Sequence, residues 1–133
     1  MTSVEILKKL ISFNTVSSNS NLELISFCKQ ILENAGAKVT IIKNKEETKG
    51  NLFATIGPEN QRGIILSGHT DVVPVKNQAW TTNPFKLTEI DDRLYGRGTA
   101  DMKSFVACAL QAATKASTMK LKTPLHFAFS YDE

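Results

Sequence analysis

The chain has 133 residues, of which 41% are hydrophobic and 22% charged, and 16 basic against 13 acidic residues give a formal net charge of +3. These proportions are those of a globular domain and exclude a disordered, collagenous or membrane-spanning chain. Basic residues do not alternate with aromatic ones, which indicates no nucleic-acid footprint. No apolar run approaches the roughly 20 residues that span a bilayer, and the first residues lack the pattern of a secretory signal. We therefore expect a cytoplasmic protein with neither nucleic acid nor membrane as a partner.

The first part of the chain predicts two amphipathic helices. Ser3 can cap the first, whose apolar residues fall on one face. The second has the same spacing, and Gly36 is placed to end it. Its apolar residues are Leu24, Phe27, Cys28, Ile31 and Leu32. Cys28 and Cys108, the two cysteines, both lie in helical patterns far from any C-x-x-C spacing, so we expect buried, reduced thiols.

From Val39 onward the period changes to that of strands. Residues 39–41 and 52–56 alternate in character on either side of the charged turn 43–49. The continuous apolar run 64–66 predicts a strand buried on both faces. The remaining predicted elements are a hairpin separate from the main sheet, a long helix and a last strand, at residues 85–95, about 102–117 and 124–131.

Helices that alternate with strands indicate a layered α/β fold. The chain stops at Glu133, directly after a predicted strand, with no helix to cover the face that this strand leaves open. Natural domain boundaries usually fall in exposed, flexible segments instead. We therefore expect residues 1–133 to be a fragment of a larger domain.

Three polar clusters follow strands or turns, where α/β proteins place their sites. His69 and Asp71 are two residues apart, a spacing that puts both side chains on one side of an extended chain. Asp101 follows the glycine-containing turn GRGTA, where its carboxylate could belong to a functional site or only cap the next helix. The turn lacks the glycine spacing of a phosphate-binding loop. Asp132 and Glu133 could bind a cation, act as a base, or be solvated. Read alone, each cluster fits a structural role better than a catalytic one.

Taken together, the clusters favour a divalent metal site. One imidazole and carboxylates from different strand ends suit zinc or a similar ion, and a shared carboxylate could bridge two ions. The absence of thiolates near them argues against a structural zinc site. A serine nucleophile is not indicated, since no G-x-S-x-G occurs, and His126 lies in a strand pattern where a packed or hydrogen-bonded histidine is expected.

These motifs resemble a known family, the acetylornithine deacetylase and succinyl-diaminopimelate desuccinylase group of dinuclear metallo-deacylases and peptidases. The resemblance covers most of the chain and is carried by SGHTDVVPV, by Trp80 with Asn83-Pro84-Phe85, by LTEIDDRLYGRGTADMKSF and by FSYDE. It implies a partial three-layer zinc-exopeptidase-like catalytic domain, with a mixed β-sheet flanked by helices and without the lid or dimerisation domain. Residues 1–133 would be the N-terminal part of that domain.

The resemblance also implies roles for single residues. His69 resembles a ligand of one metal ion, Asp71 the carboxylate behind that histidine, and Asp101 the aspartate that bridges two ions and precedes a non-proline cis peptide. Glu133 resembles the general base in an Asp-Glu-Glu motif, whose second glutamate, a metal ligand, would be residue 134. The implied cofactor is Zn²⁺, two ions per site in the complete enzyme, with Co²⁺ as a possible substitute.

The implied reaction is hydrolysis of N-acetyl-L-ornithine to L-ornithine and acetate in arginine biosynthesis, because GTADMKSF and LHFAFSYDE look closest to the acetylornithine deacetylase branch. A desuccinylase or dipeptidase of the same family is the alternative enzyme. An inactive fragment, or one subunit of a split protein that needs a complementing chain, is the alternative of another class. The resemblance further implies a small N-acyl amino acid substrate and a homodimer for the full-length enzyme; the 133-residue chain alone is expected to be inactive.

Overall fold

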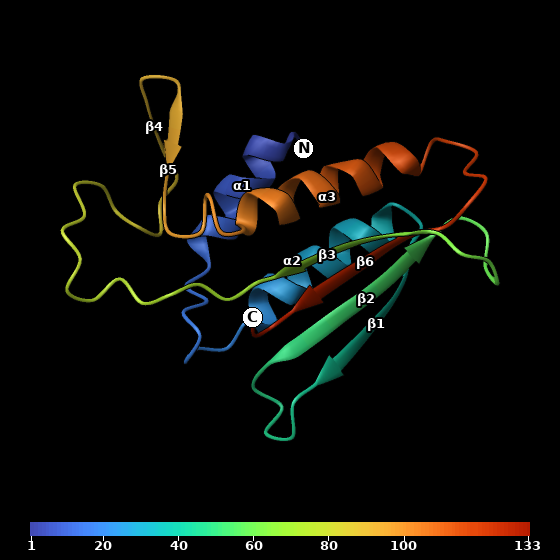
Figure 1. Cartoon of the computed structure of the whole chain (residues 1–133), viewed down its shortest axis with the longest axis horizontal. Helices are drawn as coiled ribbons and strands as arrows, with labels where there is room; N and C mark the ends of the chain where they lie inside the picture. Colours follow the sequence, from blue (N-terminus) through green and yellow to red (C-terminus); the bar gives the residue numbers. More distant parts are fainter.

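The computed structural model describes residues 1–133 and contains one four-stranded sheet and one separate hairpin (Figure 1). The sheet has the order β1 (Lys38–Lys43), β2 (Gly50–Ile56), β6 (Leu125–Ser130) and β3 (Ile64–His69). β2 runs antiparallel to both β1 and β6, whereas β3 runs parallel to β6. The predicted α/β class with a mixed sheet is therefore confirmed.

Helices α1 (Ser3–Ser12), α2 (Leu22–Asn34) and α3 (Lys103–Ala116) share one apolar core with a single face of the sheet. The cap of α1 is Thr2 rather than the predicted Ser3, since the Thr2 hydroxyl accepts from the Glu5 N–H and the Glu5 carboxylate accepts from the Thr2 N–H. Gly36 follows α2 with φ at +81°, a conformation that glycine adopts without steric cost.

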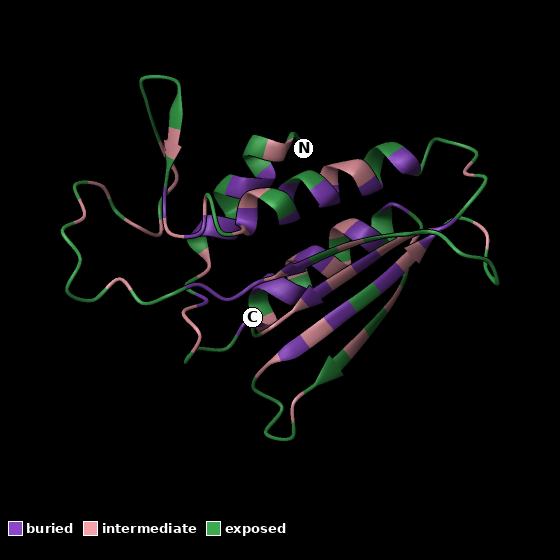
Figure 2. Cartoon of the chain, viewed as in Figure 1, coloured by how far each residue is buried: buried purple, intermediate pink, exposed green.

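The two faces of the sheet differ in what covers them. Leu52, Ala54, Phe127 and Phe129 point to the helices and are buried, as the purple bands of Figure 2 show for β2 and β6. The alternating residues point the other way, where no helix of the chain packs. On that open face His126 accepts or donates a hydrogen bond with Thr55 and stacks on Phe53, which confirms the expectation of a packed strand histidine.

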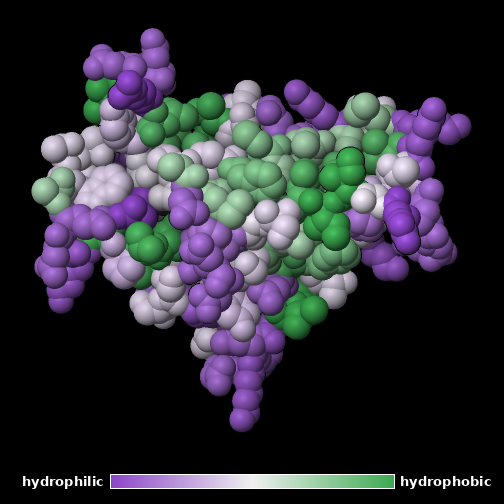
Figure 3. Space-filling view, viewed as in Figure 1, coloured by the Kyte–Doolittle hydropathy of each residue, from purple (hydrophilic) through white to green (hydrophobic).

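β3 lies at the edge of the sheet, and the prediction that this strand is buried on both faces is wrong. Ile64 and Ile65 are 63% and 56% exposed. The strand pairs only with β6, so its outer edge has no neighbour, and only Leu66 of the apolar run packs against the core. Apolar surface crosses the view of Figure 3 along α3 and β3, while hydrophilic side chains occupy the projecting loops.

The hairpin is formed by β4 (Thr88–Ile90) and β5 (Arg93–Tyr95), as predicted, and it stands apart from the main sheet (Figure 1). Both cysteines are free, but only Cys28 is buried. The expectation of a second buried thiol is wrong because Cys108 lies on the exposed side of α3. None of the helices has the length and apolar character needed to cross a membrane.

The core also contains a buried lysine. The Lys103 ammonium donates to the carbonyls of Leu10 (2.9 Å) and Phe13 (2.8 Å), at the C-terminal end of α1. Burial lowers the pKa of Lys103 to about 8, although the nearby Cys28 opposes this shift. Burial likewise raises the pKa of Cys28 to about 12, with the charge of Lys103 acting in the opposite sense. Lys103 thus ties the end of α1 to the start of α3.

Candidate active site

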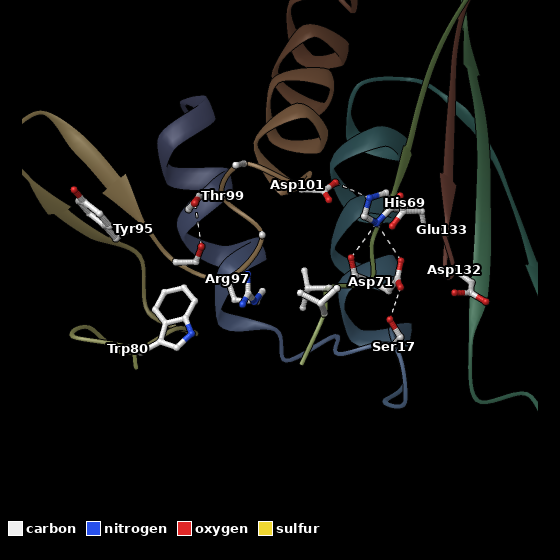
Figure 4. A pocket seen from close by; sticks show the side chains of 15 residues that line it. Ser17, His69, Asp71, Trp80, Tyr95, Arg97, Thr99, Asp101, Asp132 and Glu133 are labelled. Atoms are coloured by element: carbon white, nitrogen blue, oxygen red, sulfur yellow. Dashed lines mark hydrogen bonds and ion pairs between the residues drawn. The ribbon is translucent and has the colours of Figure 1, made fainter. Parts of the chain in front are cut away.

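A cavity of about 480 Å³ lies where β3 and β6 end and α3 begins (Figure 4). Its lining includes all four residues predicted for the site together with an aromatic and a basic side chain: His69, Asp71, Asp101, Glu133, Trp80 and Arg97. The parallel register places His69 opposite Ser130, so the segments that follow β3 and β6 leave the sheet at the same end. This pairing is why residues from distant parts of the sequence meet in one cavity.

His69 is the last residue of β3, and both of its ring nitrogens have oxygen neighbours. Nδ1 lies 3.0 Å from the backbone oxygen of Asp71 and 3.1 Å from its Oδ1. Both of these atoms are acceptors, so Nδ1 carries a proton. Nε2 lies 2.9 Å from Oδ1 of Asp101. The imidazole is 11% exposed and the Asp101 side chain 76% exposed, so Nε2 faces the open cavity.

The acidic neighbours decide the pKa of His69. Burial alone would lower that pKa, but the hydrogen bonds to Asp101 and to the Asp71 backbone, with the charges of both carboxylates, outweigh it and raise the pKa. A proton and a metal ion compete for the same Nε2 lone pair, because a histidine ligand must be neutral. A metal ion that bound to Nε2 would therefore release protons and bind more weakly as the pH falls.

Asp101 does not cap the helix that follows it. The N-cap of α3 is Met102, which makes no side-chain capping bond, and the Asp101 carboxylate points to His69 instead (Figure 4). The peptide between Asp101 and Met102 is cis, as the resemblance implied. The preceding turn depends on Gly98, whose φ is +92° and where a Cβ would lie 2.8 Å from Val72.

Glu133 completes a group of three possible ligands. His69, Asp101 and Glu133 each offer one donor atom, and these atoms all lie within 4.8 Å of one another. One imidazole and two carboxylates are the donor types that zinc takes in catalytic sites, where three protein ligands leave a position open for water or substrate. The residues present thus fit a divalent ion, and their separate roles as ligand or base stay predictions.

Ser17 contacts the site, although no sequence motif includes it. Its hydroxyl donates to Oδ2 of Asp71 at 2.5 Å. Nearby, Asn21 joins the ends of two strands, because its amide nitrogen donates to the Gly50 carbonyl and to the Thr70 hydroxyl, both at 2.9 Å. These residues belong to a polar segment without helical or strand periodicity, so only the folded structure shows which groups they contact.

The cavity wall opposite His69 is formed by Trp80 and Arg97. The Arg97 guanidinium lies 5.2 Å from the centre of the Trp80 ring and donates to the Gln78 side chain, which also accepts from the indole N–H. Nε of Arg97 is buried and has no hydrogen-bond partner. The sequence pattern marked Trp80 as part of a motif but did not predict this contact.

Comparison with known proteins gives relatives that are much longer than this chain. Acetylornithine deacetylase of Proteus mirabilis (strain HI4320) is 39% identical over 140 residues, which cover 99% of this chain and 36% of that protein. Acetylornithine deacetylase of Shigella sonnei (strain Ss046) is 37% identical over 137 residues, covering 98% of this chain and 36% of that protein. The chain therefore spans about a third of the length of these curated relatives.

Solved structures share the fold. Human carnosine dipeptidase 1 superposes with a TM-score of 0.83 at 23% identity over 96% of this chain and 31% of that chain. An M20 family metallo-carboxypeptidase from Sulfolobus solfataricus gives 0.83 at 22% identity over 96% of this chain and 30% of that one. The family model described as peptidase family M20/M25/M40 matches residues 65–133, more than half of the chain, including every residue of the His69, Asp101 and Glu133 group. The chain belongs to peptidase family M20/M25/M40.

Proposed function

We propose that this chain forms the N-terminal part of the catalytic domain of a metal-dependent amidohydrolase that converts N-acetyl-L-ornithine to L-ornithine and acetate. The observation that carries the proposal is the convergence of His69, Asp101 and Glu133 within 4.8 Å at one cavity. The identity of 39% with an acetylornithine deacetylase supports the choice of substrate. The proposal includes a place in arginine biosynthesis in the cytoplasm and a homodimeric full-length enzyme.

His69 and Asp101 would hold a divalent ion, Zn²⁺ or in its place Co²⁺, and Asp101 would be shared with a second ion. A metal bound there supplies Lewis acidity, which makes a water molecule acidic near neutral pH. The Asp71 oxygens, which accept from Nδ1 of His69, direct the Nε2 lone pair toward the cavity. Such partners of a ligating histidine fix both its tautomer and its ring orientation.

Glu133 is the proposed general base. Its carboxylate takes a proton from the attacking water as the water oxygen forms a bond with the acetyl carbonyl carbon. When the C–N bond breaks, Glu133 returns that proton to the departing amine of ornithine. The water is thereby divided between the two products, acetate and ornithine, and Glu133 ends the cycle in the carboxylate form in which it began.

The test uses the complete protein that contains residues 1–133, loaded with zinc. N-acetyl-L-ornithine, an N-succinyl diaminopimelate and a dipeptide are offered separately, and we expect kcat/KM to be highest for N-acetyl-L-ornithine. Glu133→Gln should lower kcat by roughly 10²- to 10⁴-fold. The matched control is Glu46→Gln, in the exposed turn after β1, which should change nothing. Preference for the succinyl substrate or the dipeptide would contradict the proposed substrate, and hydrolysis of none of them would contradict the proposed reaction.

We further propose that residues 1–133 alone do not turn over substrate. Three donors are too few to hold two ions at once. Purified chain 1–133 with added zinc should be inactive, and activity should return when a second chain supplies the missing ligands. Turnover by the purified chain alone that Glu133→Gln abolishes would contradict this part of the proposal.

A further inference from the structure

The segment that follows α1 is held against the residues that carry Asp71. The Ser17 N–H donates to the Val72 carbonyl at 3.1 Å, and the Val72 N–H donates to the Thr15 carbonyl at 2.9 Å. The Thr15 hydroxyl donates to the Thr70 carbonyl at 2.6 Å. These bonds fix the backbone of the segment beside Asp71 without any contribution from the Ser17 hydroxyl.

The Ser17 hydroxyl is not needed for these backbone bonds and contacts the Asp71 carboxylate instead. It donates to Oδ2 at 2.5 Å, while Oδ1 of the same carboxylate lies 3.1 Å from Nδ1 of His69 (Figure 4). The Ser17 carbonyl accepts from the Lys49 ammonium, so the residue is bound through its N–H, its C=O and its side chain. Asp71 is buried, and each of its carboxylate oxygens has one partner.

We propose that Ser17 is a positioning residue that orients the Asp71 carboxylate and, through it, the imidazole of His69. A carboxylate bonded through one oxygen can rotate about its Cβ–Cγ bond, and a hydroxyl bond to the second oxygen opposes that rotation. Hydrogen bonds to an ionised carboxylate are stronger than those between neutral groups. Ser17 thereby favours the tautomer with the proton on Nδ1 and the lone pair on Nε2. Its consequence for metal binding rests on the proposed function, whereas its effect on the metal-free imidazole does not.

The first measurement is zinc affinity, by titration calorimetry on the protein with Ser17→Ala. We expect binding to weaken about 3- to 10-fold, as loss of one hydrogen bond to a buried group does. Asp71→Asn should weaken it roughly 10- to 100-fold. The matched control is Ser18→Ala, because Ser18 is the exposed neighbour and should leave zinc affinity unchanged. In the Asp71→Asn background, Ser17→Ala should add less than about 2-fold, since residues that act through one another are not additive.

The second measurement needs no metal. In the metal-free protein, at a pH high enough for the imidazole to be neutral, ¹⁵N chemical shifts of His69 should show one protonated Nδ1 and one unprotonated Nε2. In Ser17→Ala both shifts should move toward the average of the two tautomers, and in Ser18→Ala they should not. A residue that only supports the loop would lower the unfolding temperature without moving these shifts.

The outcomes separate this inference from the proposed function. Unchanged zinc affinity and unchanged His69 shifts in folded Ser17→Ala would overturn the role of Ser17, as would full additivity with Asp71→Asn. If the unsubstituted protein binds no zinc, the proposed function fails, and the shifts alone decide the role of Ser17. If Ser17→Ala does not fold, Ser17→Cys takes its place, because the thiol is similar in size and a weak donor, and the same readouts decide.

Discussion

The end of the sheet and the interior between the helices both contain ionisable groups, but different forces control them. At the carboxyl ends of β3 and β6, acidic partners raise the pKa of His69 in spite of its burial. Between α1, α2 and α3, burial lowers the pKa of Lys103 to about 8 and raises the pKa of Cys28 to about 12. Both changes favour the neutral forms. The comparison shows that carboxylate neighbours, and not exposure, favour the charged form of this imidazole.

The largest effect is expected in the interior. Lys103→Ala removes a fully buried side chain and its hydrogen bonds to the carbonyls of Leu10 and Phe13, which keep only their bonds from backbone N–H groups. The free energy of unfolding should fall by about 3 kcal/mol, from the cavity and the two lost hydrogen bonds of the ammonium together. Urea unfolding measures it. Lys115→Ala, on the exposed side of the same helix, should change stability by less than about 0.5 kcal/mol, and an equal loss in both variants would contradict the structural role of Lys103.

Replacing each of the two histidines in turn tests where zinc binds. His69→Ala should weaken zinc binding about 100-fold, equivalent to about 2.7 kcal/mol, because it removes the proposed metal ligand rather than a supporting partner. His126→Ala is the matched control, since His126 lies on the adjacent strand with Thr55 and Phe53 as its neighbours. Zinc titration of both variants gives the comparison. Equal losses would show that zinc binds elsewhere.

The stability of the protein at alkaline pH tests the burial of Cys28, and the expected change in the free energy of unfolding is smaller. An unfolded cysteine ionises near pH 8.5, while Cys28 in the folded chain keeps its proton to about pH 12, so the folded state binds more protons in that range. The free energy of unfolding should therefore fall as the pH rises above about 9, by up to about 1.4 kcal/mol per pH unit from this group. Lys103 acts in the opposite direction between about pH 8 and 10.5, because the unfolded lysine keeps its proton longer.

The difference between unsubstituted protein and Cys28→Ala measures the contribution of the cysteine, together with the change in the pKa of Lys103 that follows from losing its Cys28 neighbour. Urea unfolding at several pH values should give a curve for Cys28→Ala that lacks this decline. Cys108→Ala should retain the decline, because Cys108 is exposed in the folded chain. A decline that persists in Cys28→Ala would assign it to another group.

The smallest change concerns the charge on His69. Asp101→Asn removes one of the carboxylates that raise the pKa of His69, so that pKa should fall. NMR titration of the imidazole in the metal-free protein measures the change. Asp132→Asn removes a charge from the same cavity without removing a partner of His69, and it should move the pKa less. The reverse order would mean that the general charge of the cavity, not the bonded carboxylate, controls the imidazole.

Much of the fold could be predicted because local rules decided it. The apolar spacing of both early helices and the stop at Gly36 follow from residues close in sequence. The exposure of Ile64 and Ile65 could not be predicted, since it depends on the absence of a neighbouring strand rather than on the strand itself. The exposure of Cys108 could not be predicted either, because an amphipathic pattern that also includes small residues does not show where the buried face of the helix ends.

The candidate site likewise contains residues that could be predicted from the sequence and one that could not. His69, Asp71 and Asp101 were found because they lie in dense motifs after predicted elements. Ser17 was missed because it lies in an aperiodic polar run and its partner is 54 residues away. A single sequence contains no signal for a contact of that kind, which exists only once α1 and β3 are packed in the same fold.

The hydrogen bonds between Lys103 and the end of α1 also have a consequence for folding during synthesis. The ammonium that satisfies the Leu10 carbonyl is encoded 93 residues later. At 5–20 residues per second, a ribosome needs roughly 5–20 s to add that stretch. During this time the end of the nascent α1 has only its local backbone bonds, from the Phe13 N–H to Leu10 and from the Thr15 N–H to Phe13, so its contact with Lys103 forms only after the start of α3 has been made. Asp101 is translated just before that lysine, so the contact between α1 and α3 can form only once a residue of the proposed metal site has also been made.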